Sequence, residues 1–492
     1  MPGKRFILAI DQGTSGTKTI VIDDKAKVHA KATEPLKTSY LNNGFVEQDP
    51  EEIYRNVLSS VEKCLKDFAH IDSIVTCGIS NQRETFVVWD KDGKPLHNAV
   101  VWQCKRSIAI CEKLKVRGLE VIVGRKTGLL IDPYFSGTKL IWLHENNTAV
   151  RNAIDKGEAY FGTVDTWLLY RLTNGRSYYT DYTNASRTLF FNLSTLSWDK
   201  ELLATFGLSK LKLPECRPSS AFFGRTDFGG LFEQNVDITS MIGDSHAAAF
   251  GEGCYLPGTA KATLGTGCSI LMNVGTQLKY SDSGMISTIC WSTEHTVQFA
   301  LEGVIVTAGA TIEWLKNELG LINDGKDTEA MALSVEDNNG VYVVPAFSGL
   351  GAPHWDMSRK ASIVGLTFNA NKNHIVRAAL ESIPYQINDI IVAMEEDTTL
   401  KLKQLMVDGG MTSNSFVVQF LADLLQIKVA NIGMADVSAL GAAYLAGLKS
   451  GVFENIEALT RLNPDIKVYQ PKANHRMNAY CLGWQKAVKL NK

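Results

Sequence analysis

Apolar residues form short runs separated by glycine-rich turns, and one such arrangement occurs twice. Residues 5–24 (RFILAIDQGTSGTKTIVIDD) carry an apolar run on each side of a turn rich in Gly and Thr. Residues 259–275 (TAKATLGTGCSILMNVG) repeat the pattern about half a chain later. Two β-rich runs around such a turn are typical of a hairpin. The repeat predicts two β-hairpins and indicates two related lobes.

Residues 374–394 follow a helical period instead. One face of this helix would collect Leu380, Ile383, Ile387, Ile391 and Met394. Pro384 lies inside the segment and predicts a kink. Strands and helices alternate elsewhere, as in residues 71–103, where Asp92-Gly93 marks a hairpin turn. This mixture predicts the α/β class.

The chain of 492 residues is too long for one hydrophobic core, so we expect two domains. The boundary is expected near residues 245–256, beside a stretch of small residues. We therefore assign residues 1–249 to an N-terminal lobe and residues 250–492 to a C-terminal lobe.

Composition excludes several classes of protein. The net charge is −2, so nothing draws the whole chain towards nucleic acid or an anionic membrane. Nine cysteines without a CxxC pair indicate a reducing compartment rather than a disulfide framework or a zinc site. No apolar run reaches the ~18 residues of a membrane span, and the first apolar run is too short for a signal peptide. We expect a cytoplasmic protein.

The first turn, DQGTSGT at residues 11–17, has the composition of an anion site. Its two glycines let backbone N–H groups approach a phosphate, and its hydroxyl side chains add donors. Lys18 adds positive charge, and Asp11 could hold Mg²⁺ directly or through water. A hairpin with a Gly-rich turn and no ligand is the alternative. The turn is not a Walker A loop, because no GxxxxGK[ST] occurs.

Two further turns resemble the first in chemistry. LGTGCS, at residues 264–269, is a second candidate phosphate turn. In residues 405–425 (LMVDGGMTSNSFVVQFLADLL) an apolar strand leads through two glycines into a helix, which leaves room for a flat ligand such as adenosine. The alternative is a strand-to-helix turn that needs a positive φ. Together the three turns predict a nucleotide held between two lobes.

Asp244 lies in the stretch IGDSHAAAFGEG, residues 242–253. A carboxylate among residues this small can be approached closely by a ligand or by backbone. It could serve as a catalytic base, as a metal ligand or as the N-cap of the following helix.

Several longer stretches carry a family resemblance. The two longest are YFSGTKLIWLHEN at 134–146 and ASIVGLTFNANKNHIVRAALE at 361–381. Shorter ones are NQRET at 81–85, VVWQCKRS at 100–107, VDTWLLYRLT at 164–173, TDYTNASRTLFFN at 180–192 and VDGGMTSNSF at 407–416. Over nearly its whole length the chain resembles the FGGY family of carbohydrate kinases, and within that family the glycerol kinases. The resemblance implies the two-lobed actin/hexokinase/Hsp70-like (ribonuclease H-like) α/β fold, with ATP on one side of a central cleft and a polyol or sugar on the other.

The resemblance also implies roles for individual residues. Asp244 would accept the proton of the attacking substrate hydroxyl, and with Asp11 it would hold Mg²⁺. The polyol would contact Arg83, Glu84, Trp102, Tyr134, Asp244 and Ser245. The nucleotide would contact Thr14, Ser15, Gly16, Lys18, Thr266, Gly309, Glu313, Gly410 and Asn414. The alternatives are a salt bridge for Arg83 and Glu84, and plain core packing for the two aromatic residues.

The sequence departs from the glycerol kinase pattern at several positions. Lys18 replaces a usual Arg and loses its bidentate fork, and Glu313 replaces a usual Gln. Ser245-His246 replace Gln-Gln after the catalytic Asp, and Ser269 replaces a Phe that packs on the glycerol carbons. With an unchanged backbone, the pocket would be larger and more polar, unless neighbours fill the space. We interpret His246 as a site-lining or structural residue rather than a second base.

The implied function is ATP- and Mg²⁺-dependent phosphorylation of a terminal hydroxyl, converting glycerol to sn-glycerol 3-phosphate. One alternative is a kinase for a four- or five-carbon polyol or ketose, and another is a non-catalytic ATP-driven binding protein of the same fold. We expect a homodimer or homotetramer. Residues 229–235 (GGLFEQN) lack the basic and glycine-rich loop with which some glycerol kinases bind fructose 1,6-bisphosphate, so we expect that control to be absent.

Overall fold

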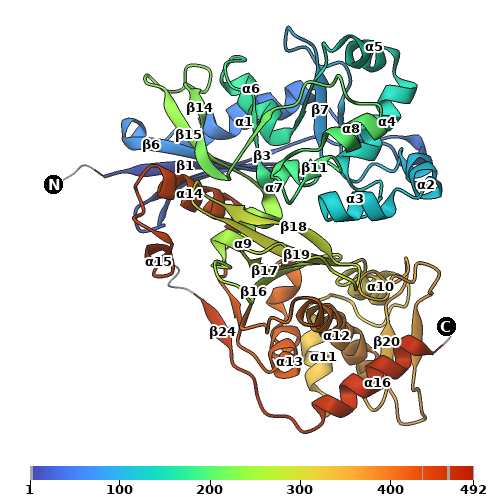
Figure 1. Ribbon diagram of the computed structural model, residues 1–492. Coiled ribbons are helices and arrows are strands. Elements are labelled where there is room, and N and C mark those ends of the chain that lie inside the picture. Colours follow the sequence, from blue (N-terminus) through green and yellow to red (C-terminus); the bar gives the residue numbers. More distant parts are fainter. Residues whose placement is uncertain (1–3, 435, 463–465, 491–492) are drawn as a thin grey trace.

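Two large β-sheets with their helices build the molecule. The computed structural model describes residues 4–434, 436–462 and 466–490. The N-terminal part of the chain (blue to green) forms one body, and most of the C-terminal part (yellow to red) forms the other (Figure 1). Met1, the first residue of the predicted N-terminal lobe, and Lys492, the last residue of the predicted C-terminal lobe, lie outside the described residues.

A six-stranded sheet forms the centre of the first body. Its strand order is β14 (Ser220–Thr226), β15 (Val236–Gly243), β6 (Ile74–Asn81), β1 (Phe6–Gly13), β2 (Gly16–Asp23) and β3 (Val28–Pro35). The hairpin predicted in residues 5–24 is confirmed, because β1 and β2 pair antiparallel around Gly13 and Gly16. β6 runs parallel to β1 and to β15. The carboxyl ends of β1, β6 and β15 therefore meet at one edge of the sheet.

A seven-stranded sheet forms the centre of the second body. Its order is β18 (Ile286–Ser292), β19 (Val297–Ile305), β17 (Cys268–Gly275), β16 (Thr259–Leu264), β22 (Gln404–Asp408), β23 (Val429–Asn431) and β24 (Lys467–Tyr469). β16 and β17 pair antiparallel, which confirms the second predicted hairpin. β22 lies parallel to β16, so the turn after Asp408 lies beside the turn of this hairpin.

Short strands form the remaining sheets. A five-stranded sheet contains β4 (Ser39–Tyr40), β5 (Val46–Gln48), β8 (Ala99–Val100), β7 (Phe86–Trp89) and β9 (Tyr160–Thr163). Three strand pairs are β10 (Tyr179–Asp181) with β13 (Glu215–Arg217), β11 (Phe191–Asn192) with β12 (Ser197–Trp198), and β20 (Tyr342–Val344) with β21 (Ser362–Val364).

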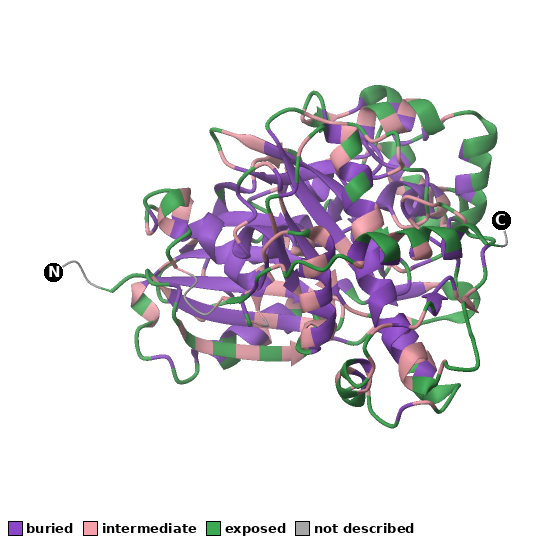
Figure 2. Cartoon of the chain, turned by 90° about the horizontal axis from the view of Figure 1, so that it is seen from below, coloured by how far each residue is buried: buried purple, intermediate pink, exposed green. Residues whose placement is uncertain are grey.

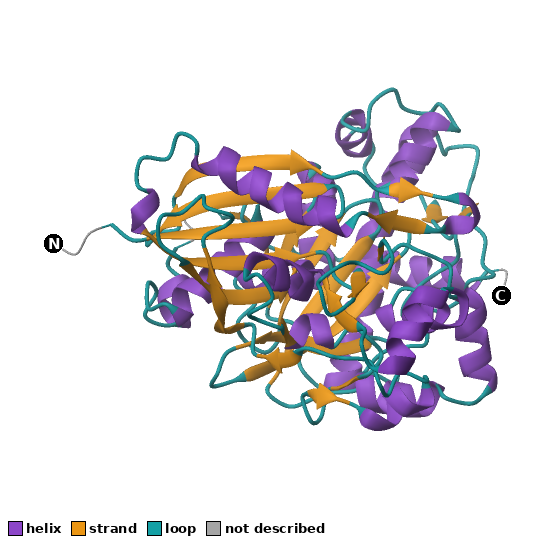
Figure 3. Ribbon diagram, turned by 90° about the horizontal axis from the view of Figure 1, so that it is seen from above, coloured by secondary structure: helices purple, strands orange, loops and turns teal. Residues whose placement is uncertain are grey.

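Helices lie over both large sheets (Figure 3). They are α1 (Pro50–Leu65), α2 (Ile108–Val116), α3 (Glu120–Thr127), α4 (Ser136–Asn146), α5 (Thr148–Lys156), α6 (Val164–Leu172), α7 (Tyr182–Ala185), α8 (Lys200–Thr205), α9 (Asp244–Gly251), α10 (Ala310–Asn317), α11 (Asp327–Leu333), α12 (Lys372–Thr398), α13 (Ser415–Leu425), α14 (Val437–Lys449), α15 (Ile456–Leu459) and α16 (Met477–Lys489). Short 3₁₀ turns are η1 (Asn42–Gly44), η2 (Ile71–Ser73) and η3 (Gly410–Ser413). The helix predicted at 374–394 is α12, which continues as one helix through Pro384.

Both faces of β1 are buried, because different helices cover them. Phe6, Leu8 and Ile10 pack in the cluster that contains residues of α1. Ile7 and Ala9 pack in the cluster that contains residues of α9 and α14. Figure 2 shows the central strands as buried and the outer helices and loops as largely exposed. α14 belongs to the C-terminal part of the sequence but covers the N-terminal sheet, so it packs as part of the first body.

Backbone contacts set how closely α14 packs against α9 and the first sheet. A Cβ atom added at Gly441 would lie 1.8 Å from the carbonyl oxygen of Ala247, and one added at Gly251 would lie 2.4 Å from that of Val437. At the next layer, a Cβ at Gly78 of β6 would lie 2.3 Å from the carbonyl oxygen of Ala442. Glycine is required at these positions because no side-chain atom fits between the backbones.

We expect Gly441→Ala to destabilise the protein by at least about 2 kcal/mol, because the methyl group would force α9 and α14 apart. The measurement is urea unfolding followed by circular dichroism. The control is Gly124→Ala in α3, where an added Cβ meets nothing closer than 3.8 Å. An unchanged unfolding midpoint for Gly441→Ala would contradict the proposed contact.

Candidate active site

Asp244 is the first residue of α9, directly after β15. The N-cap residue is Gly243 and no side chain caps this helix, so the N-cap alternative for Asp244 is wrong. Asp244 Oδ1 accepts a hydrogen bond from the N–H of Ser245 at 2.6 Å. The backbone around it is fixed from two sides: the N–H of Gly243 donates to Thr183 Oγ1 at 2.8 Å, and Ser438 Oγ donates to the carbonyl of Asp244 at 3.2 Å. The side chain remains 39% exposed, so its second oxygen can meet a ligand.

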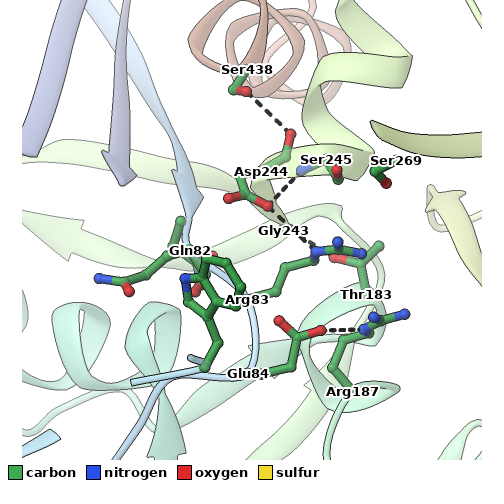
Figure 4. A network of polar contacts seen from close by, with 12 residues as sticks. Gln82, Arg83, Glu84, Thr183, Arg187, Gly243, Asp244, Ser245, Ser269 and Ser438 are labelled. Carbon is green, nitrogen blue, oxygen red and sulfur yellow. Dashed lines mark hydrogen bonds and ion pairs between the residues drawn. The ribbon is translucent and has the colours of Figure 1, made fainter. Parts of the chain in front are cut away.

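Arg83 lies beside Asp244 and points its guanidinium into a buried cluster (Figure 4). Its Nε is 3.4 Å from Asp244 Oδ1. Its Nη2 and Nη1 donate to the two carboxylate oxygens of Glu302, at 2.9 and 3.3 Å. Arg83 follows β6 and Asp244 follows β15, so the parallel pairing of these strands brings the two together.

Glu84 is held in the same cluster by Arg187. Arg187 Nε donates to Glu84 Oε1 at 2.5 Å, and its Nη1 donates to Glu302 Oε2 at 2.6 Å. Glu84 adopts a positive φ of 59°, which a residue other than glycine rarely adopts. Both Arg83 and Glu84 therefore form buried ion pairs, as the salt-bridge alternative predicted, and both belong to the cluster that reaches Asp244.

Burial and charge act in opposite directions in this cluster. Burial raises the pKa of Glu84, although Arg187 and Arg83 oppose that rise. Burial would also raise the pKa of Glu302, but the two guanidinium groups hold it well below its usual range. Glu302 is therefore a permanent anion between two permanent cations.

Trp102 and Tyr134 form an aromatic wall next to the first turn. Their ring centroids are 5.6 Å apart at an interplanar angle of 74°. Trp102 Nε1 donates to Thr14 Oγ1 at 2.9 Å, and Thr14 Oγ1 donates to Gln82 Oε1 at 3.3 Å. The structure thus places the Thr14 hydroxyl against the indole, at the junction between the first turn and the wall.

The turns of the second body lie close together. The N–H of Gly309 donates to the carbonyl of Gly265 at 3.0 Å, and the carbonyl of Thr266 accepts from Ala308 and Ala310. A Cβ at Gly309 would lie 3.1 Å from the side chain of Met411, which follows Gly410. The structure therefore brings together three stretches that were separate in the sequence, with Glu313 in the first turn of α10.

Gly410 and Asn414 differ in how much room they leave. A Cβ at Gly410 would meet no atom within 4 Å, so open space borders this turn. Asn414 is nearly buried, and its side chain caps α13 by accepting from the N–H of Val417 at 3.3 Å while donating to Thr328 Oγ1 at 3.1 Å. Its amide is thus already engaged within the protein.

Asp11, Lys18 and Asp436 lie near the turn between β1 and β2. Ser80 Oγ donates to Asp11 Oδ1 at 2.9 Å. Burial and the nearby charge of Asp244 raise the pKa of Asp11 to about 6. Lys18 Nζ lies 3.4 Å from Asp436 Oδ1, which follows residue 435 near the start of α14. Within the described residues, no group of three or more His, Cys, Asp or Glu side chains could hold a metal ion.

Sequence reasoning missed Arg187 and Glu302. Arg187 lies within residues 180–192, one of the stretches that resemble glycerol kinases. Glu302 lies in an apolar strand, VQFALEGVI. A charged residue inside an otherwise buried strand is itself a signal, because such residues are rarely buried without a partner. Ser269 Oγ donates to Glu302 Oε1 at 3.3 Å. His246 is fully buried and neither ring nitrogen has a hydrogen-bond partner among the described residues, which favours the structural interpretation.

Comparison with known proteins agrees with this geometry. Residues 6–251 match the N-terminal domain, and residues 260–450 the C-terminal domain, of the FGGY family of carbohydrate kinases. The chain is 46% identical to the glycerol kinase of Desulfitobacterium hafniense, covering 99% of each chain. It is 45% identical to that of Shewanella woodyi, covering 99% of this chain and 98% of the relative. No helix in the described part of the chain is long and apolar enough to cross a membrane.

Solved structures show the same relationship. The glycerol kinase of Plasmodium falciparum with ADP superposes with a TM-score of 0.94 at 35% identity, covering 99% of this chain and 98% of that one. A xylulose kinase from Lactobacillus acidophilus shares the fold, with a TM-score of 0.89 at 22% identity over 99% of both chains. The predicted α/β fold of the actin/hexokinase type is confirmed, as is the prediction of an ATP-using phosphotransferase. The chain belongs to the FGGY family of carbohydrate kinases.

Proposed function

We propose that this kinase transfers the γ-phosphoryl group of ATP to a terminal hydroxyl of glycerol and forms sn-glycerol 3-phosphate. The observation that carries this proposal is the position of Asp244. Its carboxylate begins α9, pairs with Arg83, and retains an exposed face at the edge where the strands of the first sheet end. The full-length similarity to proteins named glycerol kinase supports glycerol as the substrate.

Asp244 would accept the proton of the glycerol hydroxyl as its oxygen attacks the γ-phosphorus. The new O–P bond forms while the bond to the β,γ-bridging oxygen breaks, and ADP leaves with those electrons. Such a transition state is loose, so catalysis depends on alignment and on charge stabilisation. The bonds that Ser245 and Ser438 donate to Asp244 hold its carboxylate and carbonyl for that alignment. Thr183 Oγ1 accepts from the N–H of the preceding Gly243 and holds the backbone there.

The polyol would lie against the aromatic wall, because its C–H groups are apolar and its hydroxyls are not. Trp102 and Tyr134 would cover the carbon chain, and Arg83 and Glu84 would hydrogen-bond the hydroxyls. Ser245, next to Asp244, would complete this side of the site. Arg83 and Glu84 follow β6, Ser245 lies in the first turn of α9, and Tyr134 precedes α4, so the first body supplies the polyol site.

The nucleotide would occupy the turns on the other side. We assign to it Thr14, Ser15, Gly16, Lys18, Thr266, Gly309, Glu313, Gly410 and Asn414. The raised pKa of Asp11 beside Asp244 fits a site that is incomplete without a cation. Asp11 and Asp244 would hold Mg²⁺, which would supply charge stabilisation to the phosphates. We also propose that the protein forms a homodimer or homotetramer.

A four- or five-carbon polyol or ketose is the second candidate substrate. It is favoured by Ser269, a small residue whose hydroxyl bonds Glu302 at the centre of the cluster. A small side chain there leaves more room than the Phe common in glycerol kinases. Membership of a family of carbohydrate kinases argues against the other alternative, a non-catalytic ATP-driven binding protein.

The decisive experiment is coupled ADP release with Mg·ATP and a panel of glycerol, erythritol, threitol, xylitol, arabitol, xylulose and ribulose. We expect glycerol to give the highest kcat/KM. The control is Asp244→Asn, which should lower kcat by a factor of about 10² or more because no carboxylate accepts the proton. A longer polyol that exceeds glycerol tenfold would establish the second candidate, and polyol-independent ADP release alone would refute both.

Ser269→Phe tests the size of the pocket. We expect it to lower kcat/KM for erythritol and threitol at least tenfold more than kcat/KM for glycerol, because the ring would fill the space beside Glu302. Steady-state kinetics on the three polyols provide the measurement. Ser269→Ala is the matched control, since it removes the same hydroxyl without filling the space. Equal losses on all three polyols would show that Ser269 does not border the end of the substrate.

Asp11→Asn tests how far a charged Asp11, buried beside Asp244, lowers the free energy of unfolding. The pKa of Asp11 rises from 3.8 to about 6 in the folded protein, so between these values the folded state holds more protons than the unfolded state. The contribution of Asp11 to wild-type stability should therefore fall as the pH rises from 4 to 6, and the wild type should lose stability relative to the variant. In EDTA at pH 7.5, we expect the variant to exceed the wild type in the free energy of unfolding by about 1–3 kcal/mol.

The advantage of Asp11→Asn should vanish near pH 4, and urea unfolding at several pH values measures it. The amide oxygen of Asn can still accept the bond from Ser80, so the comparison isolates the charge. Wild-type and variant stabilities that run parallel over this pH range would contradict the prediction.

A further inference from the structure

We propose that Glu302 is a positioning residue for the polyol site, and that it couples polyol affinity to nucleotide binding. One carboxylate of the second body orients Arg83 directly and orients Glu84 through Arg187. The inference rests on the proposed function, because it takes Arg83 and Glu84 as polyol ligands.

Glu302 lies on β19, the strand next to β17 in the seven-stranded sheet. Its side chain is 1% exposed, so water cannot replace its partners. It receives two hydrogen bonds from Arg83 and one from Arg187, and both arginines come from the first body. A carboxylate bound by two planar guanidinium groups allows little freedom in direction to either.

The contact with Arg187 carries this constraint to Glu84. Arg187 donates to Glu302 with Nη1 and to Glu84 with Nε, so a single rigid group fixes one carboxylate relative to the other. Figure 4 shows the contact of Arg187 with Glu84 and the contact of Arg83 with Asp244. Because Glu84 also has a positive φ, its direction depends on such an external partner.

Glu302 is also linked to the nucleotide side. β17 begins directly after the Gly265–Gly267 turn, and Ser269 on that strand donates to Glu302. β19 ends at Ile305, four residues before Gly309. A Cβ at Gly267 would lie 2.6 Å from the carbonyl oxygen of Ile305, so the turn and the end of β19 touch through their backbones.

A ligand that orders these turns would therefore order the strand that carries Glu302. Nucleotide binding would then hold the polyol side chains of the first body more firmly in place. By reciprocity, polyol would strengthen nucleotide binding by the same factor.

The test is Glu302→Gln, which keeps the shape of the side chain and removes its charge. We expect the KM for glycerol to rise at least tenfold, while the Kd for ADP without polyol changes less than twofold. Isothermal titration of glycerol with and without saturating ADP gives the coupling factor. We expect this factor to exceed five in the wild type and to fall below two in the variant.

The matched control is Glu381→Gln in α12. Glu381 is also fully buried and accepts from Arg377 Nε at 2.8 Å, but it lies away from the cluster. Loss of a buried charge there should lower the melting temperature without changing the KM for glycerol or the coupling factor. Equal changes in both variants, or no change in Glu302→Gln, would overturn the positioning role.

If the proposed substrate is wrong, the experiments give a different pattern of results. If another polyol of the panel exceeds glycerol, the same titrations are made with that polyol. If no polyol binds the wild type, the crystal structure of Glu302→Gln decides: displaced Arg83 and Arg187 side chains would support the positioning role, and unmoved ones would overturn it.

Discussion

The spacing between α9, α14 and the first sheet is fixed by backbone contact rather than by side chains. α9 and α14 meet where Gly441 faces the carbonyl of Ala247, and α14 meets the first sheet where Gly78 faces Ala442. Backbone atoms in contact cannot adjust by changing rotamer, so this spacing has a single value. α9 starts with Asp244, and Ser438 near the start of α14 holds its carbonyl. The carboxylate of Asp244 is therefore placed by the same backbone contact.

Sheet topology decides which residues form the site. The spacing of α9 and α14 decides how they are placed. Parallel pairing of β1, β6 and β15 brings Asp11, Arg83 and Asp244 to one edge. The second body then adds Glu302 from β19, which no element of the first body could supply. A carboxylate from one body between two guanidinium groups from the other stabilises only one relative placement, because a shift would leave charges buried without partners.

Local sequence patterns predicted the parts of the structure that local interactions determine. The two hairpins, the turn after Asp408 and the helix around Pro384 follow from residue periodicity and turn chemistry, and all are found. The cluster around Glu302 could not be predicted, since each of its ion pairs joins residues more than a hundred positions apart that meet only through tertiary packing. The N-cap interpretation of Asp244 failed because Gly243 already has the extended conformation of the cap position.

Several features that cost stability occur together at the candidate site. Glu84 has an unfavourable φ, Asp11 is held near Asp244 against its normal ionisation, and several charges are buried around Glu302. Each would be removed by selection for stability alone, since hydrophobic replacements of buried ion pairs are often neutral or stabilising. Their occurrence together, at the edge where parallel strands end, is best explained by a requirement for fixed charge directions. A polyol offers hydroxyl groups without net charge, so its orientation must come from side chains that cannot rotate.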